Sequence, residues 1–295
     1  MDGLCRMAVP FFFTVSGYFL SAHFDEEGYW LREVQKRVRS LAVPYVLWNV
    51  IAFVLLVPVI AAADYVGHRS FGTNIPISGG RWVRAVGLDP TRMPFLVPLW
   101  YVRCLFLFVL LSPFFKAVVT RTRTIWLLFS FGVLLLYASG CFGNGDFFRY
   151  GYSLSGSFYF SLGIALRSLH VPFRASKWRG VMSSIMGIVL LVGKLEFANV
   201  GVNLLELAIP FLLYAVYCLI PDAEWPSWLT KTAFPIFLMH DIVIIYIESA
   251  LSILGWSGVG AFIVVWCASV AIPIAVAAFV RSKSTLAEQV LFGGR

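Results

Sequence analysis

The sequence predicts an all-α fold, a polytopic membrane helix bundle with nine transmembrane helices, and three observations support this. Hydrophobic residues make up 60% of the 295 positions and charged residues 13%, whereas a soluble domain has about 45–50% and about 25%. The mean hydropathy is +0.83. The apolar residues form continuous runs and do not alternate, which in hydrocarbon favours helices over barrel strands.

Nine apolar runs approach the roughly 20 residues that a helix needs to cross about 30 Å of hydrocarbon. In chain order the runs are Cys5–Ala22, Leu41–Ala63, Pro98–Phe115, Ile125–Gly140, Ser153–Leu169, Val181–Leu195, Val202–Ile220, Ala233–Leu254 and Val259–Val280. We expect residues 1–280 to form the bundle and residues 281–295 a cytoplasmic tail. A capping box from Thr285 to Glu288 predicts a short interfacial helix in that tail.

The first run contains the small pair Ser16-Gly17 in its middle. Small residues allow a neighbouring helix to approach closely, and a serine can hydrogen-bond across the contact. The pair therefore indicates either helix packing or a helix that lines a cavity, and the sequence leaves both interpretations open.

The distribution of Lys and Arg predicts the orientation in the membrane. Of the 23 basic residues, 15 flank one set of connections and 7 flank the other. The first set should be cytoplasmic, so the N-terminus of this chain lies outside and the C-terminus inside. The net charge of +8 is then explained by helix flanks that face anionic lipid, and nucleic acid is not an expected partner. The five cysteines form no CxxC or Cys/His cluster, so no metal site is expected.

Four blocks of sequence resemble the acyltransferase-3 family of bacterial integral membrane acyltransferases. They are "LCRMAVPFFFTVSGYFL", "KRVRSLAVPYVLWN", "PLWYVRCLFLFVLLSPFF" and "FPIFLMH". The resemblance implies a membrane-bound O-acyltransferase in the bacterial inner membrane. Such an enzyme moves an acyl group, typically acetyl, from acyl-CoA to a hydroxyl of a sugar or another surface-destined acceptor. No metal takes part in the reaction that the resemblance implies.

The family core has ten helices, and its first helix usually carries the histidine regarded as catalytic. No residue of this chain can be matched to that histidine, so the chain resembles the family core without its first helix. We therefore expect residues 1–295 alone to be inactive, and the catalytic base is unknown from sequence. Two other interpretations stay open, a polytopic transporter or flippase and an inactive truncated remnant of the enzyme.

A cluster of cations precedes the second run, and the resemblance associates it with the acyl-CoA cofactor. Arg37 matches the first arginine of a family pair, and Lys36 stands beside it. The second family arginine usually comes three residues later, where this chain has Ser40, so Arg39 must act one residue early. Guanidinium groups bind phosphates bidentately. The alternative is an ordinary positive flank of a transmembrane helix.

Arg103 is predicted to lie inside the third run, a few residues from its outer end. An arginine at mid-bilayer costs about 2.5–3.5 kcal/mol on insertion scales, so we expect it to face a cavity, towards the acceptor or the acyl oxygen, or to snorkel outwards. Glu206 is a candidate partner for it. Trp100 and Tyr101 are expected to be interfacial anchors, with a sugar-stacking platform as the alternative.

His240 matches a histidine often seen in the family at this place. Asp241, Glu248 and Ser252 fall within about 40° of one another on the helical projection, and His240 lies one step around. This polar stripe should face the bundle interior. His240 is therefore a candidate catalytic residue together with Arg103. The other interpretation is a core histidine whose ring is hydrogen-bonded within the bundle.

Overall fold

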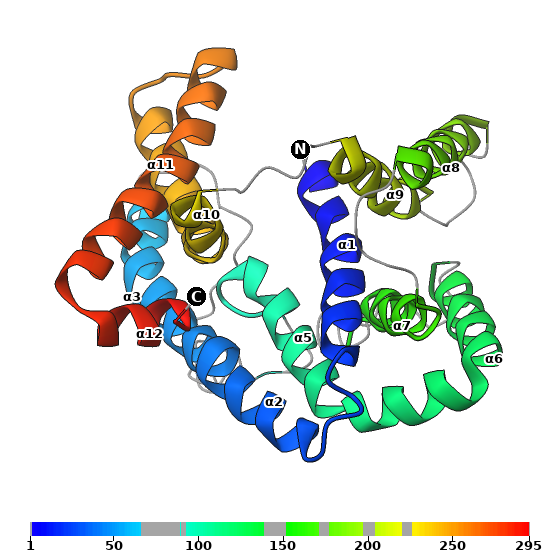
Figure 1. Ribbon diagram of the computed structural model, residues 1–295. Helices are drawn as coiled ribbons and strands as arrows, with labels where there is room; N and C mark the ends of the chain where they lie inside the picture. Colours follow the sequence, from blue (N-terminus) through cyan, green and yellow to red (C-terminus); the bar gives the residue numbers. More distant parts are fainter. Residues whose placement is uncertain are drawn as a thin grey trace. The chain divides into compact units, whose positions relative to one another are not determined.

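The structure is a computed structural model that describes residues 2–65, 89, 93–138, 152–170, 177–196, 204–219 and 226–294. Every element in these ranges is helical (Figure 1), which confirms the all-α prediction for them. The elements are α1 (Asp2–Ser21), α2 (Tyr29–Arg37), the π-helical η1 (Val38–Ala42), α3 (Val43–Tyr65), the 3₁₀ turn η2 (Val97–Leu99), α5 (Trp100–Leu110), α6 (Ser112–Ala138), α7 (Leu154–Ser168), α8 (Lys177–Glu196), α9 (Leu204–Leu219), α10 (Ser227–Ile253), α11 (Val259–Lys283) and α12 (Thr285–Phe292).

All nine predicted runs fall on helices, but fewer helices have the length and hydropathy of a membrane span. Three stretches of the described chain meet both criteria, Tyr29–Val59, Lys231–Ile253 and Val259–Lys283. The pair α5 and α6, bent by 67°, would supply a fourth if it forms one broken span. The structure therefore agrees with a polytopic helical membrane protein, and nine crossings remain a prediction.

Two segments expected to be loops are helical. The first is residues 29–40, which form α2 and the start of η1 and continue without a break into α3. Glu33, Gln35 and Lys36 favour this, because they are good helix formers. Residues 116–124 belong to α6, which is kinked at Thr122 (φ −132°, ψ 39°). The predicted run 98–115 is instead broken between α5 and α6. Pro113 has no N–H for the carbonyl of Val109, so an unbroken helix cannot continue there.

The chain divides into two compact units, and the first contains residues 1–34 and 107–224. In it, α1 and α7 lie side by side (Figure 1) with their backbones in contact. A Cβ added to Gly17 would lie 2.1 Å from the carbonyl oxygen of Phe160, and one added to Gly163 would lie 1.9 Å from that of Thr14. Phe13 packs against Gly156 near the start of α7, and Tyr18 lies against Arg167 near its end, so α1 and α7 run in the same direction. Of the two interpretations of Ser16-Gly17, the structure favours helix packing.

A cluster of aromatic rings fills the core of this first unit. The Phe108 ring lies 5.3 Å from Phe13, 5.3 Å from Phe160 and 5.8 Å from Phe115, measured between centroids. All four side chains are at most 1% exposed. Trp126 of α6 donates a hydrogen bond from Nε1 to the Ser161 hydroxyl of α7 at 3.0 Å.

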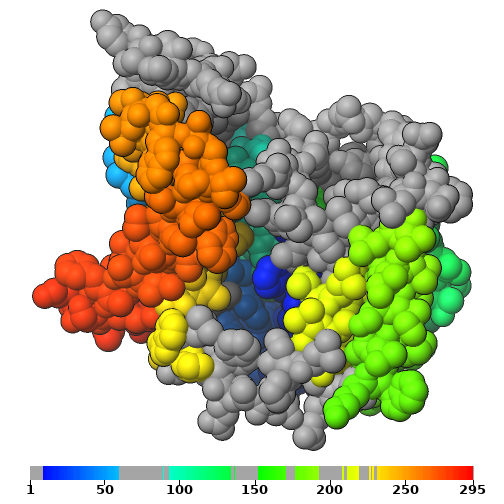
Figure 2. Space-filling view, turned by 90° about the horizontal axis from the view of Figure 1, so that it is seen from above, coloured from blue at the N-terminus to red at the C-terminus, as the bar shows by residue number. Residues whose placement is uncertain are grey.

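The second unit contains residues 35–106 and 225–295, and α10 and α11 form an antiparallel hairpin within it. The Arg281 guanidinium at the end of α11 donates to the carbonyl of Lys231 near the start of α10 at 2.6 Å. Large apolar side chains of α11, including Ile263, Trp266 and Phe279, are exposed. Figure 2 shows α11 in orange at the surface. An uncovered apolar face of this kind is expected of a helix that faces lipid.

The C-terminal helix α12 is anchored on α3 by an aromatic contact. Trp48 donates from Nε1 to the carbonyl of Leu291 at 2.8 Å, and its ring stacks on Phe292, which is fully buried. The helix predicted in the tail is present, but its cap differs from the prediction. Ser284, not Thr285, is the N-cap, with its hydroxyl accepting from the N–H of Ala287 at 3.1 Å. Glu288 pairs instead with Arg281 at 2.6 Å.

Candidate active site

Arg103 of α5 is held by two groups of the second unit. Its Nη1 donates to the carbonyl oxygen of Asp89 at 2.7 Å. The guanidinium also hydrogen-bonds with the phenol of Tyr45, a buried residue in the first turn of α3. A charged guanidinium inside a membrane bundle needs such partners, because lipid offers none.

The approach to α5 is fixed by a buried asparagine one turn beyond Tyr45. Asn49 donates from Nδ2 to the carbonyl of Tyr45 at 2.9 Å, and its Oδ1 accepts from the backbone N–H of Leu96 at 3.2 Å. One turn further along α3, the rings of Phe53 and Phe95 lie 5.4 Å apart. The residues before α5 therefore run alongside the middle of α3.

This arrangement gives the place of Arg103 along α3, whereas its depth in the membrane stays a prediction. The sequence placed it a few residues from the outer end of its run. In the structure it lies beside Tyr45, four residues after Leu41, where the second run begins at the predicted inner side. The reason is the Asn49–Leu96 hydrogen bond, which brings the chain into α5 part of the way along α3 instead of at its far end.

The predicted cofactor cations lie on the same continuous helix as Tyr45. Lys36 and Arg37 occupy the last turn of α2, where Lys36 is exposed and Arg37 half-buried, and Arg39 is exposed on η1. Eight residues separate Arg37 from Tyr45, or about 12 Å of helix. The basic cluster and Arg103 thus belong to the same end of α3.

Ser40, at the position of the second family arginine, is buried beneath the end of α12. A Cβ at Gly293 would lie 2.5 Å from the Ser40 carbonyl oxygen. Gly293 adopts φ 70°, the left-handed conformation typical of a residue that ends a helix. A long side chain at position 40 has no room there, and the exposed arginine beside it is Arg39.

The aromatic pair at the start of α5 is half-buried. The ring of Tyr101 lies 6.0 Å from Phe237 of α10, so one side of Tyr101 is already covered by protein. Trp100 is likewise half-buried. The structure thus uses Tyr101 for packing against α10.

His240 is hydrogen-bonded to its own helix through Nδ1. Its Nδ1 lies 2.8 Å from the carbonyl oxygen of Phe237 and 3.1 Å from that of Ile236. Two carbonyls can only accept, so Nδ1 carries a proton and donates to them. The hydrogen-bonded ring that the sequence offered as one alternative is therefore present, and Nε2 is the ring nitrogen that these two carbonyls do not engage.

The polar stripe around His240 is only partly inside the unit. Asp241 is half-buried, but Glu248 and Ser252 are exposed, which corrects the expectation that the whole stripe faces the interior. The side chain of Glu206, on α9, lies outside the described residues. Within the residues described, no group of three His, Cys, Asp or Glu side chains is arranged to hold a metal ion.

Sequence reasoning missed the roles of Tyr45 and Asn49. Both stand four residues apart, on one face of an otherwise apolar helix, and a polar pair at that spacing is a usable signal for a buried contact. It also treated Lys116 and Arg167 only as helix-flanking charges, although the structure brings them to one cavity in the first unit.

The chain has apolar helices long enough to cross a membrane. It also has an arginine, Arg103, that is hydrogen-bonded beside the basic end of a helix. These features define an integral membrane protein with an internal polar site. The chain belongs to the acyltransferase-3 family, whose acyltransferase domain matches residues 1–280. A curated relative is the succinoglycan biosynthesis protein ExoH of Rhizobium meliloti (strain 1021), which is 29% identical over 153 residues. That match covers 50% of this chain and 38% of ExoH. No solved structure matches the chain.

Proposed function

We propose that the protein transfers an acyl group, acetyl in the first instance, from acyl-CoA to a hydroxyl of a surface-glycan sugar. The observation that carries the proposal is the hydrogen bond between Arg103 and Tyr45, which puts a guanidinium at the end of α3 that bears Arg37. Family membership supports acyl transfer. The name of ExoH supports a polysaccharide acceptor for that relative, and we extend it to this chain.

The cations at the start of α3 would bind the donor. Arg37 and Arg39, assisted by Lys36, suit the phosphates of acyl-CoA, because guanidinium groups form charge-assisted bidentate contacts with them. With the phosphates at this end, the flexible arm of the donor would bring its thioester to Arg103, about 12 Å further along the helix.

The transfer step needs a base and a group that stabilises an oxyanion. The acceptor oxygen attacks the thioester carbonyl, and its proton passes to a base. The base would be the family histidine that this sequence lacks or, if residues 1–295 are active alone, Nε2 of His240. Arg103 would donate hydrogen bonds to the oxyanion of the tetrahedral intermediate. The C–S bond then breaks, and the CoA sulfur leaves and takes the proton. The ring contact of Tyr101 with Phe237 supports this pairing, because it packs the first turn of α5 on α10 one turn before His240.

We further propose that the chain crosses the bacterial inner membrane nine times, with its N-terminus outside and its C-terminus in the cytoplasm. Residues 1–280 would form the acyltransferase bundle and residues 281–295 the tail. The parallel course of α1 and α7 supports this, because both would cross from outside to inside. Trp100 would face the acceptor side of the site, and Glu206 would pair with Arg103.

Mass spectrometry of surface glycans tests the proposed activity. Cells that carry the gene should show acylated sugars that are absent without it, and Arg103→Ala should abolish them at equal protein level in the membrane. The matched control is Arg121→Ala, which removes an exposed arginine of α6. Identical glycans with and without the gene would contradict a glycan acceptor, and full acylation by Arg103→Ala would exclude the role given to Arg103.

A further inference from the structure

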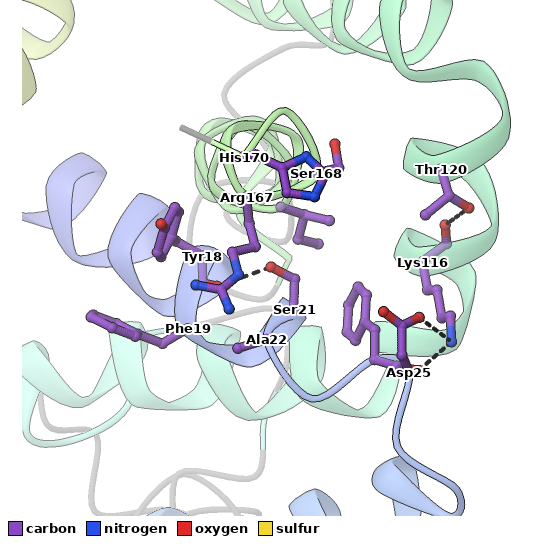
Figure 3. Close-up of a pocket in the computed structure, with 12 residues that line it drawn as sticks. Tyr18, Phe19, Ser21, Ala22, Asp25, Lys116, Thr120, Arg167, Ser168 and His170 are labelled. Atoms are coloured by element: carbon purple, nitrogen blue, oxygen red, sulfur yellow. Dashed lines mark hydrogen bonds and ion pairs between the residues drawn. The ribbon is translucent and has the colours of Figure 1, made fainter. Parts of the chain in front are cut away.

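A cavity of about 730 Å³ opens in the first unit where the ends of α1 and α7 meet the start of α6 (Figure 3). Two cations line it, Lys116 and Arg167. Its apolar lining includes Phe19, Phe24 and Ile164. The cavity is thus amphiphilic, with positive groups beside apolar ones.

Arg167 stands on the last turn of α7 and reaches towards α1, as Figure 3 shows. Its guanidinium carbon lies 5.3 Å from the centre of the Tyr18 ring. A cation–π contact with a ring uses none of the guanidinium's N–H groups as hydrogen-bond donors to an oxygen, so they can still donate to an anion. Among the described residues no carboxylate pairs with Arg167. Its guanidinium is therefore held in place by Tyr18, and its N–H groups can bind an anion.

Lys116 provides the second charge and is held in place by its surroundings. Its ammonium donates to the carbonyl of Phe24 and lies over the Phe24 and Tyr29 rings, at 5.8 and 5.3 Å from their centres. Asp25 is 3.9 Å away but fully exposed to solvent, so it screens Lys116 only weakly. Arg123 adds a third cation nearby, donating to the Ser168 hydroxyl at 3.3 Å.

We propose that this cavity binds a phosphate-bearing amphiphile, with its phosphate on Arg167 and Lys116 and its apolar part along Phe24 and Ile164. Two sources share this chemistry, an anionic membrane phospholipid and the phosphates of acyl-CoA. The phospholipid is the expected one, because the cavity lies at the ends of two apolar, parallel helices and Phe19 at its edge is 52% exposed.

Retention of lipid by the purified full chain is the test. The chain is placed in nanodiscs of phosphatidylcholine with a minor fraction of phosphatidylglycerol, and native mass spectrometry then counts the phosphatidylglycerol that stays bound. Arg167→Ala should weaken retention about tenfold to a hundredfold, as expected for a lost charge-assisted phosphate contact. Arg167→Lys should lie between, because a lysine keeps the charge but loses the fork. Arg121→Ala, on α6 but outside the lining, should retain lipid like the wild type.

A second arm separates the two sources. Coenzyme A is titrated into the same nanodiscs, and its binding is compared between wild type and Arg167→Ala. Weaker coenzyme A binding with unchanged lipid retention would keep the phosphate site but overturn the lipid as its occupant. If a folded Arg167→Ala protein, with an unchanged Tm, retains both ligands, the site does not exist. Arg103→Ala should leave lipid retention intact, so failure of the proposed acyl transfer would be seen separately.

Discussion

The phenol of Tyr45 and the guanidinium of Arg103 are hydrogen-bond partners, and the bond joins the first turn of α3 to the first turn of α5. Asn49 ties the same stretch of α3 to the backbone at Leu96. Together these contacts fix where Arg103 lies along the helix that also carries the basic cluster.

Tyr45→Phe removes only the hydroxyl that orients Arg103. We expect kcat for acyl transfer to fall about tenfold, since a hydrogen bond to a charged group contributes roughly 1.5–3 kcal/mol. Arg103→Ala should cost more, about a hundredfold to a thousandfold, as for other groups that stabilise an oxyanion. Steady-state kinetics with labelled acetyl-CoA measure both. A change in KM alone for Tyr45→Phe would mean that the phenol serves binding and not positioning.

Arg37→Ala should raise the KM for acyl-CoA about tenfold to a hundredfold and leave kcat nearly unchanged. The reason is the loss of one phosphate contact that is equally strong in the ground and transition states. Arg39→Ala is expected to have a smaller effect, because Arg39 stands one residue away from the family position. If both variants insert normally and keep their donor kinetics, the cluster only signals topology.

The packing of α1 on α7 can be tested at its glycines. Gly163→Ala would push a Cβ to 1.9 Å from the Thr14 carbonyl oxygen, a rigid backbone atom. We expect a loss of about 1–3 kcal/mol, seen as a lower Tm in detergent. Gly132→Ala is the matched control, because its Cβ would meet nothing within 4 Å. It should be neutral or slightly stabilising, since alanine favours a helix. Equal Tm values for the two variants would contradict the close contact.

Orientation in the membrane follows from labelling of two exposed sites with a membrane-impermeant maleimide. In a protein whose native cysteines are serine, Glu27→Cys between α1 and α2 should react only after the cells are opened. Ser257→Cys, in the turn between α10 and α11, should react in intact spheroplasts. The reverse pattern would place the cation cluster outside and remove the cytoplasmic donor from the proposal.

Helix positions could be predicted from the sequence because long apolar runs have no other stable form in lipid. The cluster at Lys36, Arg37 and Arg39 could also be predicted, since its spacing is local. The helix positions and the cation cluster both depend on residues close together in the sequence, so composition and periodicity are enough to predict them.

The place of Arg103 beside Tyr45 of α3 could not be predicted in the same way. It depends on the hydrogen bond from the Leu96 backbone to Asn49, two residues that a long connection separates. The cap of α12 shows the same limit at shorter range. Glu288 fits a capping box with Thr285 by spacing, yet Arg281, seven residues earlier, binds it instead. Tertiary partners decided both outcomes.

The packing of α12 on Trp48 has a practical consequence for the design of fusion proteins. Phe292 is buried, and Gly293 contacts Ser40, the neighbour of Arg39. A segment fused after Arg295 would therefore start two residues beyond a glycine that lies close to the basic cluster. A bulky fluorescent reporter or an affinity tag joined there without a spacer would crowd the place proposed for the donor phosphates. Purification handles are therefore better attached through a long, flexible linker, and kinetic constants are better measured after the handle has been cleaved.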